Sequence, residues 1–229
     1  MMHWAFRLRV CAILASAICV DAAEIGGKVR VTKPLTRKRI TISQVYERTA
    51  ALPAAPAHAD SLRDEIARVV IYLEGSAGKA HPVSARIDQL QRRFDPDVAV
   101  VPVGSAVSFS NSDPIFHNVF SLSKLKSFDL GNYPKGQSRS VTFQESGVVL
   151  VYCHLHPNMS AAIVVTPTDW STRPDLDGNY CLKNVPLGSY QLVAWHKSAG
   201  FFRRPVEVKE GGLINLDWEI PLRQPLAAP

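Results

Sequence analysis

One short segment, residues 152–159 with the sequence Tyr-Cys-His-Leu-His-Pro-Asn-Met, places three metal-binding side chains close together. Cys153, His156 and Met159 follow one another at intervals of three residues, and they supply a thiolate, an imidazole and a thioether. A second imidazole, that of His117, lies upstream. Two histidines and a cysteine with a weak axial methionine are the donor set of an electron-transfer copper site. We therefore expect one copper ion per chain, cycling between Cu(II) and Cu(I).

Each of these side chains also has an ordinary structural interpretation. A single histidine such as His117 is usually a hydrogen-bonded loop residue, and a buried Met159 would fill space in a core. Cys153 would form a disulfide with Cys181 in an oxidising compartment. Zinc is the rival metal, because a closed tetrahedral site could use Cys153, His154, His156 and His117. The joint occurrence of all the donors beside predicted strands favours copper.

Short apolar segments lie on both sides of the candidate ligands. Seven of them run between turn residues, at residues 98–103, 106–109, 119–120, 128–130, 141–143, 148–152 and 161–165. Pro102 has no N–H to donate, which suits the edge of a sheet or a bulge. Short strands at this spacing predict an all-β sandwich of two sheets.

These features together resemble the cupredoxins, the type 1 copper proteins that include amicyanin, plastocyanin and pseudoazurin. The spacing Cys-x-x-His-x-x-Met resembles the ligand loop of amicyanin, and the sequence His-Asn-Val at residues 117–119 resembles the family's first-ligand motif. The resemblance covers residues 94–165 and implies a Greek-key β-sandwich. It implies His117, Cys153 and His156 as strong copper ligands, Met159 as the axial ligand, and Asn118 as the residue that hydrogen-bonds around the cysteine loop. His154 departs from the family, where this position is small or apolar.

A second resemblance spans the two ends of the chain. Residues 177–182 and 185–192 are similar to the carboxypeptidase regulatory-like, or transthyretin-like, β-sandwich, and residues 27–29 and 69–75 resemble its opening strands. The resemblance implies a smaller sandwich split over residues 24–78 and 168–225, with the cupredoxin domain, residues 79–167, inserted between them. Such sandwiches serve as binding or spacing modules without catalysis. We expect His196, at the end of one of its strands, to be a surface histidine.

The first 22 residues have the features of a signal peptide. Arg7 and Arg9 precede an apolar stretch, residues 10–20, that is too short to span a bilayer of about 30 Å, and small residues follow it. We expect Sec-type export to the periplasm or the medium, with no membrane span in the mature chain. Loss of the leader would reduce the four cysteines to two, Cys153 and Cys181.

The composition is that of a folded protein with a mild positive charge. Hydrophobic residues make up 46% of the chain and the formal net charge is +6, which would attract an acidic redox partner. Basic residues are not interleaved with aromatic ones, so nucleic-acid binding is not expected. The candidates for steering charge are Lys124, Lys126, Lys135 and Arg139, and an uncharged rim around His156 is expected from Leu155, Pro157 and Ala161.

The expected function is single-electron transfer to or from a redox protein, without substrate turnover. Four protein ligands leave no open position for Lewis-acid chemistry, so an enzyme is not expected. The whole chain resembles exported proteins that are labelled methylamine utilisation proteins. Two alternatives stay open: a periplasmic copper carrier without redox traffic, and a zinc-binding structural module.

Overall fold

The chain folds almost entirely into β-strands. The computed structural model describes residues 23–35, 62–75 and 78–221, so the predicted leader, residues 1–22, lies outside the described residues. One short helix, α1 (Leu62–Ala67), accompanies the strands of the described part, and no helix there is long and apolar enough to cross a membrane. The expected all-β fold class is confirmed.

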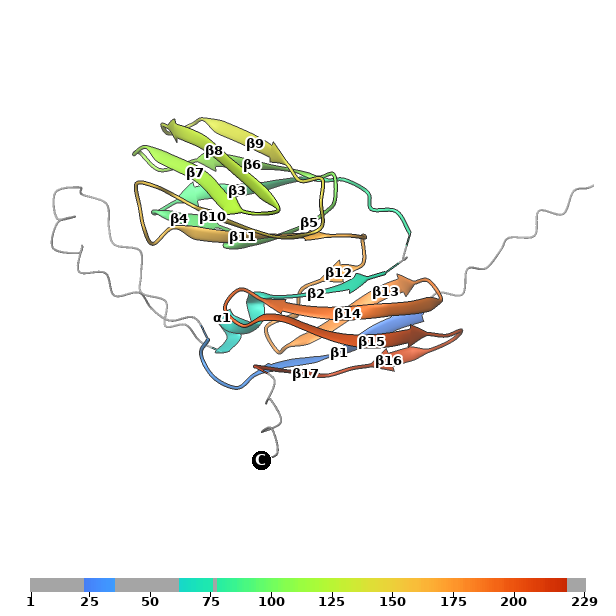
Figure 1. Ribbon diagram of the computed structural model, residues 1–229. Coiled ribbons are helices and arrows are strands. Elements are labelled where there is room, and N and C mark those ends of the chain that lie inside the picture. Colours follow the sequence, from blue (N-terminus) through green and yellow to red (C-terminus); the bar gives the residue numbers. More distant parts are fainter. Residues whose placement is uncertain (1–22, 36–61, 76–77, 222–229) are drawn as a thin grey trace, which may run out of the picture.

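Nine strands from the middle of the sequence form one sandwich, drawn in green to yellow in Figure 1. They are β3 (Ser84–Leu90), β4 (Arg93–Asp95), β5 (Val98–Pro102), β6 (Ala106–Asn111), β7 (His117–Ser123), β8 (Lys126–Tyr133), β9 (Ser138–Thr142), β10 (Gly147–Tyr152) and β11 (Ser160–Thr166). One sheet has the order β5-β11-β10-β7-β8, and the other has the order β4-β3-β6-β9. We call this unit the central sandwich.

Alternating burial explains why these residues form two facing sheets. In β6, Val107 and Phe109 are fully buried between the sheets, while the intervening Ser108 is partly exposed. Pro102 closes β5, which lies at the edge of its sheet and pairs only with β11 among the described strands, as its missing N–H predicts.

Strands β3 and β4 of the central sandwich lack the apolar pattern that would predict a strand from the sequence. β3 pairs in parallel with β6 and antiparallel with β4, yet its side chains are mostly polar and Ile87 is its one fully buried apolar residue. The apolar pattern begins only at Phe94, within β4. The central sandwich therefore begins about ten residues before the apolar pattern that predicts it.

The remaining strands form a second sandwich, which we call the flanking sandwich. They are β1 (Ala23–Val31), β2 (Val69–Glu74), β12 (Ser171–Thr172), β13 (Asn179–Val185), β14 (Gly188–His196), β15 (Gly200–Val208), β16 (Leu213–Asn215) and β17 (Trp218–Ile220). One sheet has the order β13-β1-β16, with β17 also on β1, and the other has the order β12-β2-β14-β15. Gly178, in the predicted Asp-Gly turn, has a φ of +89°, and a Cβ atom there would collide with the carbonyl of Val29.

The two sandwiches pack against each other, with the central one above the flanking one in Figure 1. Strand β2 is buried on both faces: Val69, Ile71 and Leu73 pack into the flanking sandwich, whereas Val70 and Tyr72 pack against the central one. The apolar layer between the sandwiches is formed by Val70, Tyr72, Val98, Ala162, Val164, Val193 and Trp195. The outer face of strands β5 and β11 is thus buried in this layer.

Polar contacts reinforce this apolar layer. Arg68, which follows α1, donates from Nε to Asp97 at 3.0 Å, just before β5. Lys197, which follows β14, donates from Nζ to the carbonyl oxygen of Ser160 at 2.9 Å, at the start of β11. The flanking sandwich therefore touches the central one at the strand that leaves the candidate ligand loop.

His196 is not the surface histidine that the sequence predicts. Its side chain is fully buried, and its Nε2 lies 3.1 Å from Oε2 of Glu65, which is also fully buried. The prediction fails because α1 covers the end of β14. Helix α1 is too short and polar for its packing partner to be identified from the sequence.

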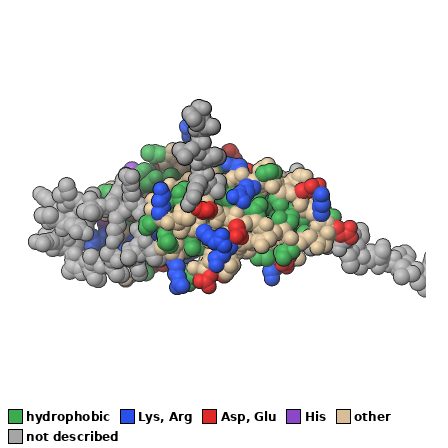
Figure 2. Space-filling view, turned by 90° about the horizontal axis from the view of Figure 1, so that it is seen from below, with side chains coloured by type: hydrophobic (Ala, Val, Ile, Leu, Met, Phe, Trp, Pro, Cys, Tyr) green, Lys and Arg blue, Asp and Glu red, His purple; other side chains and the backbone are tan. Residues whose placement is uncertain are grey.

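The face of the flanking sandwich that points away from the central one carries mixed charge. Figure 2 shows basic and acidic side chains interspersed over this face. Arg30, on β1, pairs with Asp217 at 3.5 Å, and both are largely exposed. In the described part of this face the positive charge is not gathered into the continuous patch that a nucleic acid would require.

Candidate metal centre

The candidate ligands lie at one end of the central sandwich, where three strands of the same sheet meet. His117 is the first residue of β7, Cys153 follows β10 directly, and His156 and Met159 belong to the loop between β10 and β11. Strand β10 pairs with both β7 and β11, so the loop is held by a strand on each side. Backbone pairing, rather than loop conformation alone, therefore brings residues 117 and 153 together.

The structure brings three of the four predicted ligands into one cluster. His117 Nδ1 lies 3.1 Å from His156 Nδ1, and Cys153 Sγ lies 3.7 Å from His156 Nδ1 and 4.0 Å from His117 Nδ1. The centre of this triangle is about 2.1 Å from all three atoms, close to the bonds of about 2.0–2.3 Å that imidazole and thiolate make to zinc. The donors therefore stand at the separation that one first-row metal ion requires.

The fourth predicted ligand, Met159, is buried beside this cluster. Its side chain is 1% exposed and belongs to the same hydrophobic core as Cys153. Its backbone N–H donates to the carbonyl oxygen of His156 at 2.9 Å, which closes the loop into a turn before β11. A buried thioether at this position is compatible with a weak axial ligand and with core packing alike.

Cys153 is set up to be a thiolate. Burial raises the pKa of its thiol, but hydrogen bonds with the His117 and His156 rings when these are protonated, and with the backbone N–H of Asn118, outweigh burial and lower the pKa to about 5. The thiolate is the form that binds metals. The lowered pKa therefore favours the form of Cys153 that binds metals.

Asn118 braces the cysteine from the neighbouring strand. Its backbone N–H points to Cys153 Sγ at 3.4 Å, and its Oδ1 accepts from the backbone N–H of His154 at 3.4 Å. Its Nδ2 donates to Asp129 Oδ1 at 2.7 Å, which fixes the orientation of the amide. These contacts join Asn118 to the sulfur of Cys153, to the residue after it and to Asp129.

His154 does not join the cluster. Its ring stacks on Phe120, with centroids 3.7 Å apart and an interplanar angle of 1°, and its Nε2 lies 3.4 Å from Asp129 Oδ2. The closed zinc set of three histidines and Cys153 is therefore not assembled among the described residues. Residues 154 and 156 diverge because the loop turns between them instead of running straight.

The two remaining cysteines are free thiols in different sandwiches. Cys153 is buried in the central sandwich, whereas Cys181 is exposed on β13, with its thiol 3.8 Å from Glu24 Oε2. The disulfide interpretation of this pair is therefore excluded.

The rim of the site differs in part from the sequence expectation. Leu155 is 45% exposed, but Ala161 is fully buried in the core and forms no part of the rim. Phe116, which precedes His117 and is 57% exposed, is a further apolar residue beside the site that was not predicted. A large apolar residue directly before a predicted ligand was the available signal.

The candidate steering charges are spread over both ends of the sandwich. Lys124 and Lys126 lie at the turn between β7 and β8, whereas His117 opens β7 at the other end and pairs with Tyr133. Lys135 follows Tyr133 and so lies at the metal end of the hairpin.

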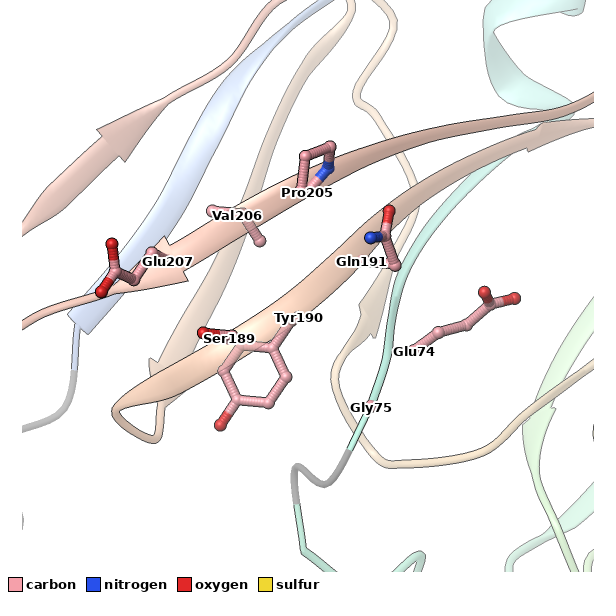
Figure 3. A pocket seen from close by; sticks show the side chains of 8 residues that line it. All are labelled: Glu74, Gly75, Ser189, Tyr190, Gln191, Pro205, Val206 and Glu207. Carbon is pink, nitrogen blue, oxygen red and sulfur yellow. The ribbon is translucent and has the colours of Figure 1, made fainter.

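A shallow groove of about 490 Å³ lies elsewhere, on the flanking sandwich (Figure 3). Its lining comes from β2, β14 and β15 and consists of Glu74, Gly75, Ser189, Tyr190, Gln191, Pro205, Val206 and Glu207. The groove contains neither a histidine nor a cysteine, so it does not compete with the cluster as a transition-metal site.

Comparisons with known proteins gave matches to solved structures. No family model matches the chain, and no curated protein matches it. Solved structures that it resembles are cupredoxins. A purple cupredoxin from Nitrosopumilus maritimus matches at 25% identity over 35% of this chain and 98% of its own, with a TM-score of 0.34. Amicyanin from Paracoccus versutus matches at 20% identity over 42% of this chain and 96% of its own, with a TM-score of 0.34.

A copper-containing nitrite reductase from Thermus scotoductus also matches, at 23% identity over 41% of this chain and 25% of its own, with a TM-score of 0.35. These neighbours include an enzyme beside small copper proteins. At TM-scores of this size the chemistry of the site has to be judged from its own side chains.

Proposed function

We propose that the chain binds one copper ion through His117, Cys153, His156 and Met159 and carries single electrons between redox proteins. The observation that carries the proposal is the triangle of two imidazole Nδ1 atoms and the Cys153 sulfur, with a thiol pKa of about 5. Two histidines and a thiolate, with a methionine nearby, match copper better than zinc. Bound copper would supply a centre that accepts and releases one electron.

In this proposal the protein fixes the positions of the four ligand side chains. His117 and Cys153 are attached to paired strands, and Met159 is fixed in the core. Asn118 keeps the sulfur directed toward the two imidazoles. A donor set held in this way moves little when the charge of the centre changes, and this favours fast electron exchange.

We place the electron exit at His156. His156 is half-buried, whereas His117 and Cys153 are 0% and 4% exposed. The exposed apolar side chains of Leu155 and Phe116 flank the two histidines in sequence and suit close docking of a partner protein. The donor or acceptor is a redox protein, and the net charge of +6 favours an acidic one.

We further propose that the protein acts outside the cytoplasm and that the flanking sandwich is a support, not a catalyst. The leader-like residues 1–22 motivate the location. We also propose the division into residues 79–167 and residues 24–78 plus 168–225. The grouping of the strands into two sandwiches supports the division, and a sequence resemblance supports the transthyretin-like assignment of the second unit.

The test is the visible spectrum of the purified protein after addition of Cu(II). We expect intense visible absorption from the Cys153 thiolate, one copper per chain, bleaching by ascorbate and return on oxidation. Cys153→Ser should abolish the colour. Cys181→Ser is the matched control, because this thiol is exposed on the other sandwich, and it should leave the spectrum unchanged.

Two results would contradict the proposal. A colourless protein that takes up zinc but not copper would indicate a structural metal site. A coloured protein whose copper exchanges readily with a chelator and whose electron self-exchange is very slow would be a copper carrier instead.

A further inference from the structure

A buried carboxylate, that of Asp113, contacts one of the candidate ligands. Asp113 lies in the loop between β6 and β7 and is 3% exposed. Its Oδ2 lies 2.8 Å from Nε2 of His117, on the side of the ring opposite the metal-facing Nδ1. Both side chains are buried, so little solvent screens this contact.

The position of Asp113 is itself fixed by the hairpin between β3 and β4. The backbone N–H of Gln91 donates to its Oδ1 at 2.6 Å, and that of Arg92 donates to its Oδ2 at 2.8 Å. Both turn residues have positive φ angles, 54° and 56°, which point consecutive N–H groups at the carboxylate. The backbone N–H of Asp113 in turn donates to Asn111 Oδ1 at 2.9 Å.

These contacts hold Asp113 as a carboxylate. Its two oxygens accept from the Gln91 N–H and the Arg92 N–H and face the His117 ring, so every one of these contacts uses Asp113 as an acceptor. An ionised carboxylate only accepts hydrogen bonds, so the proton of this contact stays on His117 Nε2. The lone pair of the neutral ring is then on Nδ1, the atom that faces Cys153 and His156.

The other histidine of the cluster has no such support. Among the described residues, His156 makes its contacts through Nδ1, and no hydrogen-bond partner of its Nε2 is found there. The negative charge of Asp113 therefore acts on the candidate metal site through His117 and not through His156.

We propose that Asp113 is a positioning residue of the metal centre: it fixes His117 in the Nε2–H form with Nδ1 toward the metal, and its charge favours the more oxidised ion. The inference rests on the proposed copper site. Carboxylates behind ligand histidines orient the ring and increase its basicity, and their loss lowers metal affinity by about 10–100-fold.

The first test needs no metal. In alkaline solution, where the ring is neutral, ¹H–¹⁵N spectroscopy of the metal-free wild-type protein should show His117 protonated at Nε2, with a slowly exchanging proton. A wild-type ring protonated at Nδ1 would overturn the proposal, whatever metal the protein binds. A wild-type protein that shows the expected tautomer but binds no copper would overturn the proposed function and leave the role of Asp113 in orienting the ring.

The second test is Asp113→Asn. We expect about a 10–100-fold loss of Cu(II) affinity and a smaller loss of Cu(I) affinity. A tenfold difference between the two losses corresponds to a reduction potential about 59 mV higher. The Nε2 proton signal of His117 should also exchange faster in this variant.

Asp88→Asn is the matched control. Asp88 lies on the neighbouring β3 and accepts hydrogen bonds from the hydroxyls of Ser110 and Ser112, but none from a histidine. It should leave the His117 signal and both copper affinities unchanged. A folded Asp113→Asn protein with wild-type affinities for both ions would overturn the proposal, as would an equal change in Asp88→Asn. If Asp113→Asn does not fold, the tautomer of the wild-type protein still decides.

Discussion

Two buried histidines, one in each sandwich, face a carboxylate through Nε2, yet only one of them faces a metal site. His117 contacts Asp113 at 2.8 Å, and His196 contacts Glu65 at 3.1 Å. The difference lies at the other ring nitrogen. Nδ1 of His196 accepts from the backbone N–H groups of Ser198 and Ala199, each at 3.2 Å, whereas Nδ1 of His117 faces two further metal-binding side chains.

The comparison teaches that a carboxylate partner does not by itself identify a ligand histidine. A histidine can bind a metal through Nδ1 only if that nitrogen is not already accepting hydrogen bonds from backbone N–H groups. The pKa values follow the same division. Burial lowers the pKa of His196, and Glu65 does not fully offset it. Burial also lowers the pKa of His117, but hydrogen bonds to Cys153 and Asp113 outweigh it and raise the pKa.

The largest expected effect comes from replacing each histidine by glutamine. His117→Gln removes an Nδ1 donor, so Cu(II) affinity should fall by more than the roughly 10–100-fold expected for losing a supporting residue. His196→Gln should leave copper affinity unchanged and lower the free energy of unfolding by about 1–3 kcal/mol, because Glu65 and two backbone N–H groups lose their partner. Copper titration measures the Cu(II) affinity of both variants, and urea unfolding measures their stability. Equal copper affinities in the two variants would contradict the distinction between His117 and His196.

The next largest effect concerns whether the two sandwiches that contain these histidines unfold together in one cooperative transition. Trp195, beside His196, is 3% exposed in the apolar layer between the sandwiches. Trp195→Ala should cost about 3–5 kcal/mol and leave a single unfolding transition monitored at both sandwiches. Phe201→Ala is the control, since Phe201 is 42% exposed on the neighbouring strand. Two separated transitions in the wild-type protein would mean that the sandwiches fold independently.

The pH dependence of stability should sharpen the contrast. The pKa of His196 is lower in the folded than in the unfolded protein, so the unfolded state takes up its proton first as pH falls. Stability should therefore be full above about pH 6.5 and decline below it, by up to about 1.4 kcal/mol for each unit of difference. In His196→Gln this decline should be absent from urea unfolding curves measured between pH 5 and 8. An unaltered decline in the variant would assign it to other groups.

The smallest effect is expected where the flanking sandwich touches the ligand loop. Lys197 donates to the carbonyl of Ser160, the residue after Met159. Lys197→Met should change Cu(II) affinity by no more than about fivefold, the value of one hydrogen bond of about 1 kcal/mol. Lys126→Met, in the distant β7–β8 turn, should change nothing. A change above tenfold in Lys197→Met would mean that the flanking sandwich helps to shape the site.

The clustering of His117, Cys153 and His156 could be predicted from the sequence because ligand chemistry depends on residue type and short spacing. Cys153, His156 and Met159 lie within one loop, and the apolar alternation around them indicates the strands that hold it. The role of Asp113 could not be predicted from the sequence, because it depends on contacts with the β3–β4 hairpin. That hairpin is a polar segment, and it reaches the β6–β7 loop only in the folded chain. His196 was misplaced for the same reason, since α1 covers it.

The sequences of β2 and β11 indicate that the two sandwiches are covered by further structure. The β2 sequence Val-Val-Ile-Tyr-Leu has apolar side chains at both odd and even positions, and this indicates burial on both faces of a strand. The β11 sequence has the same character. Such runs predict that both faces are covered, but they do not identify the covering sheet.

The way the chain enters and leaves the central sandwich affects how the molecule would respond to mechanical tension. Strand β2, which leads in, pairs antiparallel with β12, which leads out, through Tyr72 with Ser171 and Ile71 with Thr172. The N–H of Leu73 also donates to the carbonyl oxygen of Trp170 at 3.0 Å. Because these bonds join the two connections, a pull on the ends of the chain would load the flanking sandwich first. The metal-binding end of the molecule would bear no tension until that joint opened.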